Sequence, residues 1–296
     1  MRLFLAAMLA LALVQPGFAA TARERLVVEP AWLAGRLGDP ALVVLQVGDR
    51  AGYEAGHIPG ARLVSLADFA APPRGPDPLI LELPEAEALR ARLVALGVTE
   101  RSRIVVVPTR EGVQSATRVV FTLDAAGLGR RTVLLNGGAA AWAASGGALS
   151  TEVPAPRPGR LRPIRFKPLV VDADFVKAHA RRRGYAVVDA RTPEFFSGAK
   201  TGGTAARPHK AGHIAGARSV PFAEVTTPDL KLASPEAIAA RFEAAGVKPG
   251  DTVIAYCHVG QQATATLFAA RTLGLDVLLY DGSFEDWSRR DGPVGK

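Results

Sequence analysis

The fold is decided by residues 252–274, which read TVIAYCHVGQQATATLFAARTLG. The apolar, β-branched run at 252–256 predicts a buried strand, and residues 264–273 predict a helix that Gly274 ends. Cys257 begins the loop between them. Where a strand ends and a helix begins, open α/β sheets bind ligands beside unpaired N–H groups and the positive end of the helix dipole. This stretch therefore predicts an α/β domain with a binding site at Cys257.

The chain contains an internal repeat. Residues 56–62, GHIPGAR, return at 212–218 as GHIAGAR. Each copy follows an apolar strand pattern, at residues 42–47 and 185–189. Because matching segments in the same order are the signature of duplicated units, the sequence predicts two copies of one domain.

Other elements of the repeat alternate in type. Residues 84–96 and 235–245 each begin with proline and are followed by glycine, which is the pattern of a helix. Residues 103–107 precede a loop and another helix, as residues 252–256 do. Strands that alternate with helices at this spacing predict a mostly parallel sheet with helices on both faces. We therefore predict an α/β fold of two tandem domains of this kind.

The domain limits follow from the same pattern. We expect an N-terminal domain at residues 25–148 and a C-terminal domain at residues 168–296. Between them, residues 149–167 are rich in proline and arginine, which suits an extended linker.

Residues 1–22 predict a cleaved signal peptide. Arg2 supplies a positive start, and the apolar run at 3–14 is shorter than the roughly 20 residues that a membrane span needs. Small residues favour cleavage after Ala19 or Ala22, and an uncleaved anchor is the alternative. We therefore expect a periplasmic or secreted protein with no stable membrane anchor.

Composition narrows the classes of partner. The 296 residues carry a formal net charge of +8, but the basic residues are scattered, so we expect no nucleic-acid partner. Cys257 is the only cysteine of the chain, which excludes an internal disulfide. One cysteine and five histidines without ligand-like clustering predict no metal site, and no cofactor is expected.

The loop after the thiol predicts an anion cradle, with Gly260 allowing a tight turn whose N–H groups point inward. Those groups and the helix dipole stabilise a thiolate, and equally a terminal sulfur that carries negative charge. The alternative is a buried cysteine that only fills space. The cradle residues are His258, Val259, Gly260, Gln261 and Gln262.

This loop and the repeated Gly-His-Ile-x-Gly-Ala segment resemble the rhodanese superfamily over nearly all of the chain after the signal peptide. They are similar to its tandem group, which contains thiosulfate and 3-mercaptopyruvate sulfurtransferases. The resemblance implies that Cys257 is the catalytic nucleophile. It would take a sulfane sulfur as a persulfide from a small anionic donor and pass it to a thiophilic acceptor, cyanide or a thiol.

In such proteins the N-terminal copy is inactive. Aligning Gly112 with Gly260 places Thr109 at the position of the cysteine, and threonine cannot carry a persulfide. We therefore expect the first domain to be structural, or to form one wall of a cleft over the loop of the second domain.

Two basic residues are implied in substrate binding. Arg191 follows Asp189 at a strand end, as an arginine near the active site does in this family, and pairing with Asp189 is its alternative role. Lys200 lies in the Gly-rich insertion 198–211, and a solvated lysine is the alternative. His258 can assist proton transfer or bind an anionic donor, and a side chain that only points to solvent is its alternative.

The donor and the class of function stay open at this point. Thiosulfate-preferring members tend to have Arg and Lys after the cysteine and mercaptopyruvate-preferring members Gly and Ser, whereas this chain has His258 and Val259. A related phosphatase family needs an arginine six residues after its cysteine, where this chain has Ala263, so we do not expect phosphatase chemistry. An exported sulfur-binding or persulfide-delivery protein with little turnover is the alternative function.

Overall fold

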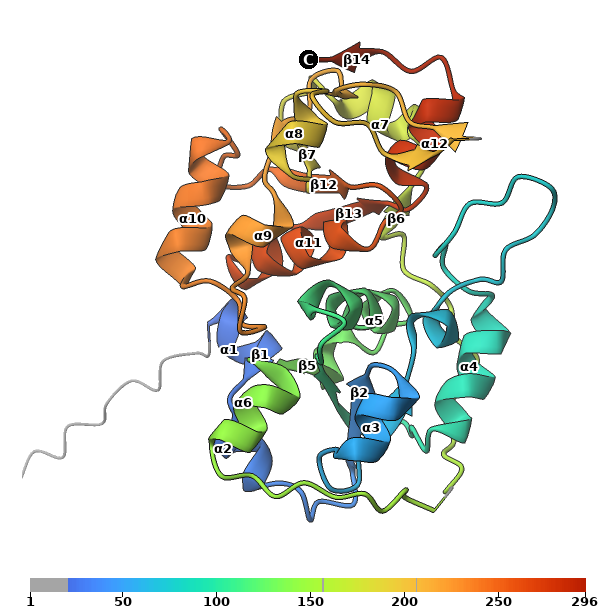
Figure 1. Cartoon of the computed structure of the whole chain (residues 1–296), viewed down its shortest axis with the longest axis vertical. Helices are drawn as coiled ribbons and strands as arrows, with labels where there is room; N and C mark the ends of the chain where they lie inside the picture. Colours follow the sequence, from blue (N-terminus) through green and yellow to red (C-terminus); the bar gives the residue numbers. More distant parts are fainter. Residues whose placement is uncertain (1–20, 156, 206) are drawn as a thin grey trace, which may run out of the picture.

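The computed structural model describes residues 21–155, 157–205 and 207–296 (Figure 1). Its N-terminal half contains, in order, α1 (Ala22–Leu26), β1 (Val27–Val28), α2 (Pro30–Ala34), β2 (Leu42–Val47), α3 (Arg50–Ala55), β3 (Arg62–Val64), η1 (Leu66–Phe69), α4 (Ala86–Ala95), β4 (Arg103–Val107), α5 (Val113–Ala125), η2 (Gly129–Arg131), β5 (Thr132–Leu135) and α6 (Gly138–Ala144).

The C-terminal half repeats this pattern with an added hairpin, β8 and β9. Its elements are β6 (Val170–Val171), α7 (Ala173–His179), β7 (Tyr185–Asp189), α8 (Pro193–Phe196), β8 (Gly203–Thr204), β9 (Arg207–Pro208), β10 (His213–Ile214), β11 (Arg218–Ser219), α9 (Phe222–Val225), α10 (Pro235–Ala244), β12 (Thr252–Tyr256), α11 (Gln262–Thr272), β13 (Val277–Tyr280), α12 (Ser283–Arg289) and β14 (Val294–Gly295).

Each half is built on a five-stranded sheet in which every neighbouring pair is parallel. The strand order is β1-β5-β4-β2-β3 in the first sheet and β6-β13-β12-β7-β11 in the second, so the two orders correspond strand for strand. Helices cover both faces of each sheet (Figure 1). The predicted fold class, two tandem α/β domains with mostly parallel sheets, is confirmed.

The central strands alternate their side chains between two apolar layers. In β12, Val253 and Ala255 face a cluster that Cys257 also joins, whereas Ile254 and Tyr256 face a separate outer cluster. The inner cluster continues into the N-terminal half, where Ile104 and other residues of its sheet belong to it. The two domains therefore share one hydrophobic core.

Helices α5 and α11 lie between the two sheets and pack against each other (Figure 1). Every residue of α5 except Gln114 is buried, because the helix is covered on one side by its own sheet and on the other by the C-terminal domain. A hydrogen bond of 3.0 Å joins the hydroxyls of Thr117 and Thr264 across this contact.

The segment that joins the domains is extended along the N-terminal domain. Gly159 N–H donates to the carbonyl of Val94 at 2.7 Å, and Lys167 N–H donates to the carbonyl of Ala125 at 2.8 Å. Within the described residues between 151 and 169 there is neither helix nor strand.

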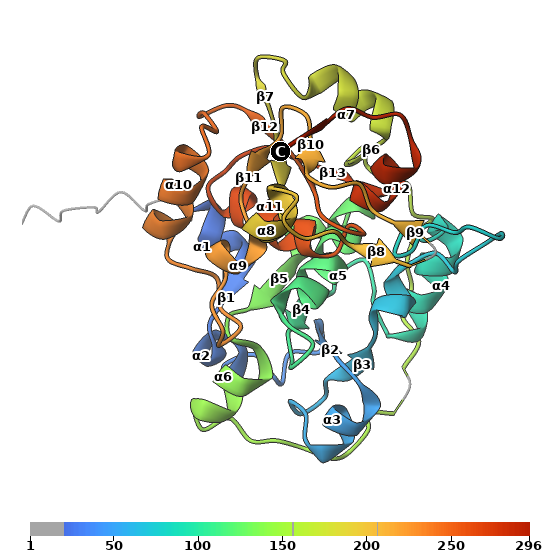
Figure 2. The same ribbon diagram turned by 45° about the horizontal axis from the view of Figure 1, so that its top comes forward.

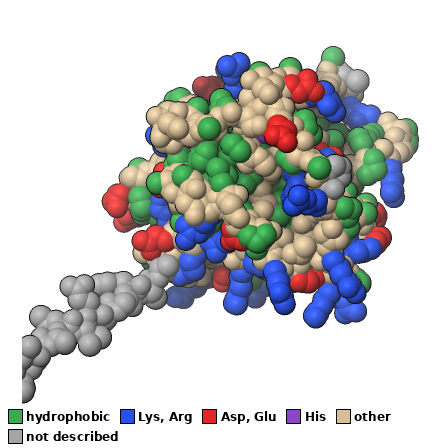
Figure 3. All heavy atoms as spheres, turned by 90° about the horizontal axis from the view of Figure 1, so that it is seen from below, with side chains coloured by type: hydrophobic (Ala, Val, Ile, Leu, Met, Phe, Trp, Pro, Cys, Tyr) green, Lys and Arg blue, Asp and Glu red, His purple; other side chains and the backbone are tan. Residues whose placement is uncertain are grey.

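Two further features concern the surface and the N-terminus. On the face shown in Figure 3, Lys and Arg side chains follow the lower edge with few acidic side chains between them. None of the helices in the described ranges is long and apolar enough to cross a membrane. Apart from Thr21 and Ala22, the predicted signal peptide lies outside the described residues.

Candidate active site

Cys257 follows β12 directly and is buried, with 1% of its surface exposed. Its N–H donates to Ser283 Oγ at 3.2 Å, and its carbonyl accepts the N–H of Phe284 at 3.0 Å. Ser283 has a left-handed φ of 53° and donates its own hydroxyl to the carbonyl of Tyr280 at 2.9 Å. The end of β13 and the start of α12 therefore fix the backbone at the thiol.

The loop after the thiol presents a run of free backbone donors. No acceptor among the described residues receives the N–H groups of residues 258–263. The first of these belong to the loop, and the last belong to the first turn of α11, where helix N–H groups have no partner within the helix. Such a run of donors at a helix start suits an anion.

Gly260 is required in this turn. Its φ is +79°, and a Cβ at this position would lie 2.8 Å from the carbonyl oxygen of Asp281 and 3.1 Å from Nη1 of Arg118. Only glycine adopts this conformation without strain, and only glycine fits beneath these atoms. The conformation of this turn therefore requires glycine at position 260.

The equivalent loop of the first domain corrects one prediction. The carbonyl of Pro108, directly after β4, accepts the N–H of Ala139 at 3.1 Å, just as the Cys257 carbonyl accepts the N–H of Phe284. Pro108, and not Thr109, is therefore the counterpart of Cys257. The alignment slips because Gly112 is the last residue before α5, whereas Gly260 stands one residue further from α11.

The two copies differ consistently at this point. Proline has no N–H, and Gly138, the counterpart of Ser283, has no hydroxyl to accept one. The first loop also closes on itself, since Gly112 N–H donates to the carbonyl of Thr109 at 2.9 Å and Thr109 Oγ1 donates to Val47 at 2.6 Å. The first copy therefore has no thiol at this turn, and it has neither the N–H nor the hydroxyl that fix the backbone at Cys257.

The N-terminal domain instead supports the second loop through Arg118 of α5, a residue that the sequence analysis missed. Its guanidinium is 1% exposed and Nη1 donates to the Gly260 carbonyl at 3.2 Å and to Asp281 Oδ1 at 2.5 Å. Asp281 Oδ2 in turn accepts the N–H of Leu83 at 2.8 Å. A buried ion pair between the domains therefore holds the cradle turn.

Arg191 is paired with Asp189, the alternative role that the sequence left open. Nε and Nη2 reach the Asp189 carboxylate at 2.6–3.1 Å, and Nη2 also donates to the Gly212 carbonyl at 2.8 Å. Burial acts to lower the pKa of Arg191, but Asp189 outweighs it, so the pKa lies above its ordinary value. The Arg191 guanidinium also lies 3.9 Å from the centroid of the Phe284 ring, and Phe284 is the residue whose N–H bonds the Cys257 carbonyl.

His258 lies in a group of rings above the loop. The ring of Phe195 stands edge-on to it at 4.6 Å, and the ring of His209 is 5.8 Å away. Burial, followed by Arg191 and His209, lowers the pKa of His258 to about 4. The imidazole is therefore neutral near pH 7 and can offer hydrogen bonds but not a positive charge.

His209 is a second residue that the sequence analysis missed. It follows the β8–β9 hairpin, is 9% exposed, and its Nδ1 is buried without a hydrogen-bond partner among the described residues. Burial, with Arg191 and Arg289, lowers its pKa as well. A Cβ on Gly202 would lie 2.8 Å from Nδ1 of His258 and 3.0 Å from Nδ1 of His209, so the hairpin packs directly on both rings.

The hairpin also reaches the N-terminal domain, where it lies beside the loop that precedes α4 (Figure 2). Arg207 pairs with Asp77 at 2.7 Å and donates to the Pro76 carbonyl at 3.0 Å. Lys200, at the start of the insertion, is exposed, and its N–H donates to Glu194. Within the described ranges no hydrogen bond or ion pair joins Lys200 to the cradle.

The two histidines of the repeat have structural roles. His57 is fully buried, stacks on Tyr53 at 3.7 Å and bonds the carbonyls of Tyr53 and Glu152. His213 stacks on Phe196 at 3.7 Å and bonds its carbonyl at 2.8 Å. Each ring fixes the turn that the repeat places after its strand.

Comparison with known proteins identifies the family. A model of the rhodanese-like domain matches the chain twice, at residues 29–145 and 172–290. The chain belongs to the rhodanese family. The resemblance seen in the sequence is thereby confirmed for both copies.

The relatives of this rhodanese include named sulfurtransferases and a named sulfur carrier protein. It is 33% identical over 271 residues to the thiosulfate sulfurtransferase of Azotobacter vinelandii, covering 91% of this chain and 96% of that protein. It is 33% identical over 267 residues to a probable 3-mercaptopyruvate sulfurtransferase of Pseudomonas aeruginosa, covering 86% and 92%. It is also 29% identical over 295 residues to the sulfur carrier protein TtuD of Thermus thermophilus, covering 93% and 98%. This rhodanese is a sulfurtransferase.

Proposed function

We propose that this rhodanese moves a sulfane sulfur from a small anionic donor, thiosulfate or 3-mercaptopyruvate, to cyanide or a thiol through a persulfide on Cys257. The observation that carries the proposal is the run of backbone donors at 258–263, which begins next to the thiol and has no acceptor among the described residues. These N–H groups would hold the negative terminal sulfur.

The chemistry proceeds in two displacements. With thiosulfate, the Cys257 thiolate attacks the outer sulfur, a new S–S bond forms, and the donor S–S bond breaks with its electron pair leaving on sulfite. The acceptor then attacks the terminal sulfur, and the electron pair of the protein S–S bond returns to Cys257. With 3-mercaptopyruvate, the C–S bond breaks instead, and pyruvate leaves after its carbon takes a proton.

Charged side chains contribute little to this cradle. Arg191 is engaged by Asp189, and His258 is neutral near pH 7. We therefore assign the stabilisation of the sulfur mainly to backbone dipoles, which need no reorganisation when the persulfide forms. Arg191 would add a long-range positive potential rather than a direct bond.

The decisive test is steady-state turnover with thiosulfate and with 3-mercaptopyruvate, each with cyanide and with a thiol, for the wild type and Cys257→Ala. We expect turnover with at least one donor and none in the variant. Mass spectrometry of the wild type after donor alone should show one added sulfur atom on the peptide that contains Cys257. Full activity in Cys257→Ala would refute the proposal.

A delivery protein with little turnover is the second candidate, and it is favoured by the relative that is named a sulfur carrier protein. A delivery protein would load a single sulfur from the donor but release it to small acceptors far more slowly than it loads. Comparing single-turnover loading with steady-state release separates the two candidates.

For the N-terminus, we propose export with cleavage after Ala19. Thr21 and Glu24 form a reciprocal capping box at the start of α1, with Glu24 N–H bonded to Thr21 Oγ1 at 3.2 Å. Cleavage after Ala22 would remove that cap, whereas cleavage after Ala19 keeps it. The intact mass of protein recovered from the periplasm distinguishes these sites, and uncleaved protein in the membrane would refute export as a free protein.

A further inference from the structure

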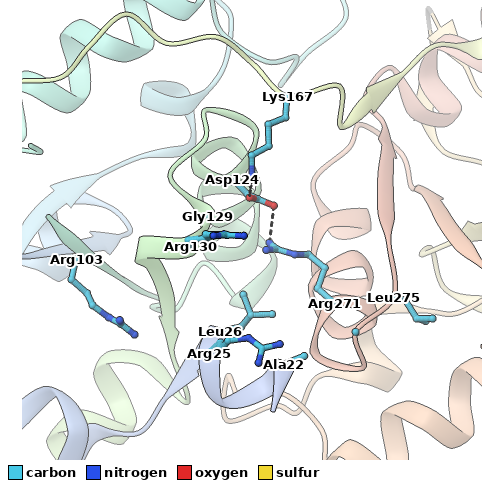
Figure 4. A pocket seen from close by; sticks show the side chains of 11 residues that line it. Ala22, Arg25, Leu26, Arg103, Asp124, Gly129, Arg130, Lys167, Arg271 and Leu275 are labelled. Atoms are coloured by element: carbon cyan, nitrogen blue, oxygen red, sulfur yellow. Dashed lines mark hydrogen bonds and ion pairs between the residues drawn. The ribbon is translucent and has the colours of Figure 1, made fainter. Parts of the chain in front are cut away.

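We propose that a second cleft, at the opposite edge of the sheets from Cys257, binds a small-molecule polyanion that carries two or more phosphate groups. The cleft has a volume of about 810 Å³ (Figure 4). Its wall includes Arg103 at the start of β4, Gly129 before β5 and Leu275 before β13. The cleft thus lies where the strands begin, whereas Cys257 follows the C-terminal end of β12, so this site is separate from the thiol.

The cleft concentrates positive charge from both domains. Its lining contains one acidic residue, Asp124, and five basic residues, which are Arg25, Arg103, Arg130, Lys167 and Arg271. They come from α1, β4, η2, the joining segment and α11. Arg103 lies 5.1 Å over the ring of Trp32, and the lining as a whole carries more positive than negative charge, so its potential attracts an anion.

Asp124 pairs with two of the five cations of the cleft, and its single negative charge does not neutralise the lining. Its carboxylate is 9% exposed, with Oδ1 2.9 Å from Lys167 Nζ and Oδ2 3.1 Å from Arg271 Nη1. Both oxygens are thus occupied, one by each cation. Gly129 makes this possible, because a Cβ there would lie 1.9 Å from Oδ1.

Arg130 is the cation most available to a ligand. It is exposed, and no hydrogen bond or ion pair joins it to any residue that the structure describes. Figure 4 shows the side chains of Arg25, Arg130 and Arg271 extending into the same space below Asp124. Guanidinium groups in such an arrangement match phosphate oxygens in pairs.

The size and lining of the cleft define the ligand class. Its volume lies within the range of about 300–1,000 Å³ typical of small-molecule sites, and one tetrahedral oxyanion would fill only a small part of it. Cations that come from separate elements of both domains need several anionic groups to reach them. Leu26 and Leu275 add apolar surface to the lining. A di- or triphosphate, free or attached to an organic group, meets these requirements.

The test uses the full-length protein and inorganic pyrophosphate and tripolyphosphate as probes. Isothermal titration is run at constant ionic strength, so that surface charge is screened equally at every point. It should show one saturable site. Sulfate at the same ionic strength should bind much more weakly. Non-saturable heats, or equal binding of sulfate, would refute a site for polyanions.

Variants locate the site. Arg130→Ser removes a cation with no partner among the described residues, so the fold should persist by circular dichroism while polyphosphate affinity falls at least about tenfold. Arg74→Ser, another exposed arginine, lies in the loop before α4 on the thiol side and serves as the matched control. If Arg130→Ser and Arg74→Ser bound polyphosphate with equal affinity, the assignment of the site to this cleft would be wrong.

A third variant separates this cleft from the cradle. Cys257→Ser should bind polyphosphate as the wild type does, and saturating sulfite should not compete. Loss of binding in either experiment would mean that the anion occupies the cradle and would overturn this proposal. Loss of sulfur transfer in Cys257→Ser tests the proposed function and does not bear on the cleft.

Discussion

At the scale of single residues, the site depends more on backbone geometry than on charged side chains. Gly260 has a left-handed φ of +79°. Its carbonyl accepts a hydrogen bond from Arg118, and atoms of Arg118 and Asp281 occupy the space that a Cβ would need. The backbone conformation of Gly260 therefore determines the direction in which the neighbouring N–H groups point.

Gly260→Ala tests this dependence. A left-handed residue with a Cβ costs about 1–2 kcal/mol, and here the Cβ would also press on backbone and on Arg118. Gly274→Ala is the matched control, since Gly274 has φ +83° but nothing within 4 Å of its Cβ. We expect both variants to lose stability, but only Gly260→Ala to lose sulfur transfer. Equal activity in the two variants would contradict the role of this turn.

His258 predicts a pH dependence of stability. Its pKa of about 4 in the folded protein lies below the value of about 6.5 in an unfolded chain, so between these values the unfolded state binds more protons. Its contribution to the free energy of unfolding is complete above pH 6.5 and is lost as the pH falls toward 4. His258→Gln should show a smaller fall in Tm between pH 7 and pH 5 than the wild type.

Two other groups with shifted pKa values, His209 and Glu82, do not alter the sign of this difference. Burial also lowers the pKa of His209, which acts in the same direction, and Glu82, whose pKa burial raises, acts in the opposite one. Both groups remain in the variant, so they largely cancel when the two proteins are compared. Identical pH profiles would show that His258 does not contribute.

At the scale of elements, α5 of the N-terminal domain supports the active-site loop of the C-terminal domain. Arg118, in the middle of a helix buried on all sides, bonds both Gly260 and Asp281. A buried charge is retained only where it is paired, and this pair lies between the domains.

Arg118→Met should weaken both stability and activity. Leaving Asp281 buried without its partner costs about 3–5 kcal/mol, and a displaced turn should lower kcat/KM by roughly ten- to a hundredfold. Arg118→Met combined with Asp281→Leu should recover stability but not activity. A purely structural role for the pair predicts that both recover together.

Thr117→Val is the control for this experiment. It removes the hydrogen bond of 3.0 Å to Thr264 in the same contact between α5 and α11 but does not touch Gly260. We expect its kcat/KM to stay within about twofold of the wild type at temperatures well below unfolding, because a lost neutral hydrogen bond costs only about 1 kcal/mol of stability.

At the scale of the whole molecule, the two domains are one cooperative unit. The inner apolar cluster contains residues of both sheets and of α5 and α11. Separating the domains would expose Leu267 and Phe268, which are 1% and 3% exposed. Burial of such side chains is worth about 1.5–3 kcal/mol each, so neither domain is expected to unfold alone.

Calorimetry tests this cooperativity. The protein should unfold in one transition with equal calorimetric and van't Hoff enthalpies. Leu135 belongs to an apolar cluster of the N-terminal domain that is separate from the shared one. Leu135→Ala should destabilise the protein by about 2–5 kcal/mol, and the temperature at which sulfur transfer is lost should fall by as much as the unfolding transition does. Two transitions, with activity following only the second, would contradict a shared unit.

The sequence by itself determined the duplicated α/β fold and the position of the nucleophile. Both are encoded locally, because a buried strand, a glycine turn and a helix start are each specified by neighbouring residues such as Val253, Cys257 and Gly260. The repeat then extends the same pattern to the first copy without any knowledge of contacts.

Only the tertiary structure decided which side chains meet at the site. Arg118 and Asp281 are 163 positions apart, and His209 reaches His258 through a hairpin with no counterpart in the first copy. Pro108 replaced Thr109 as the counterpart of Cys257 because the hydrogen bond to the following helix, and not the glycine spacing, fixes the register. Pairing of distant charges depends on how elements pack, and no local pattern of residues specifies that.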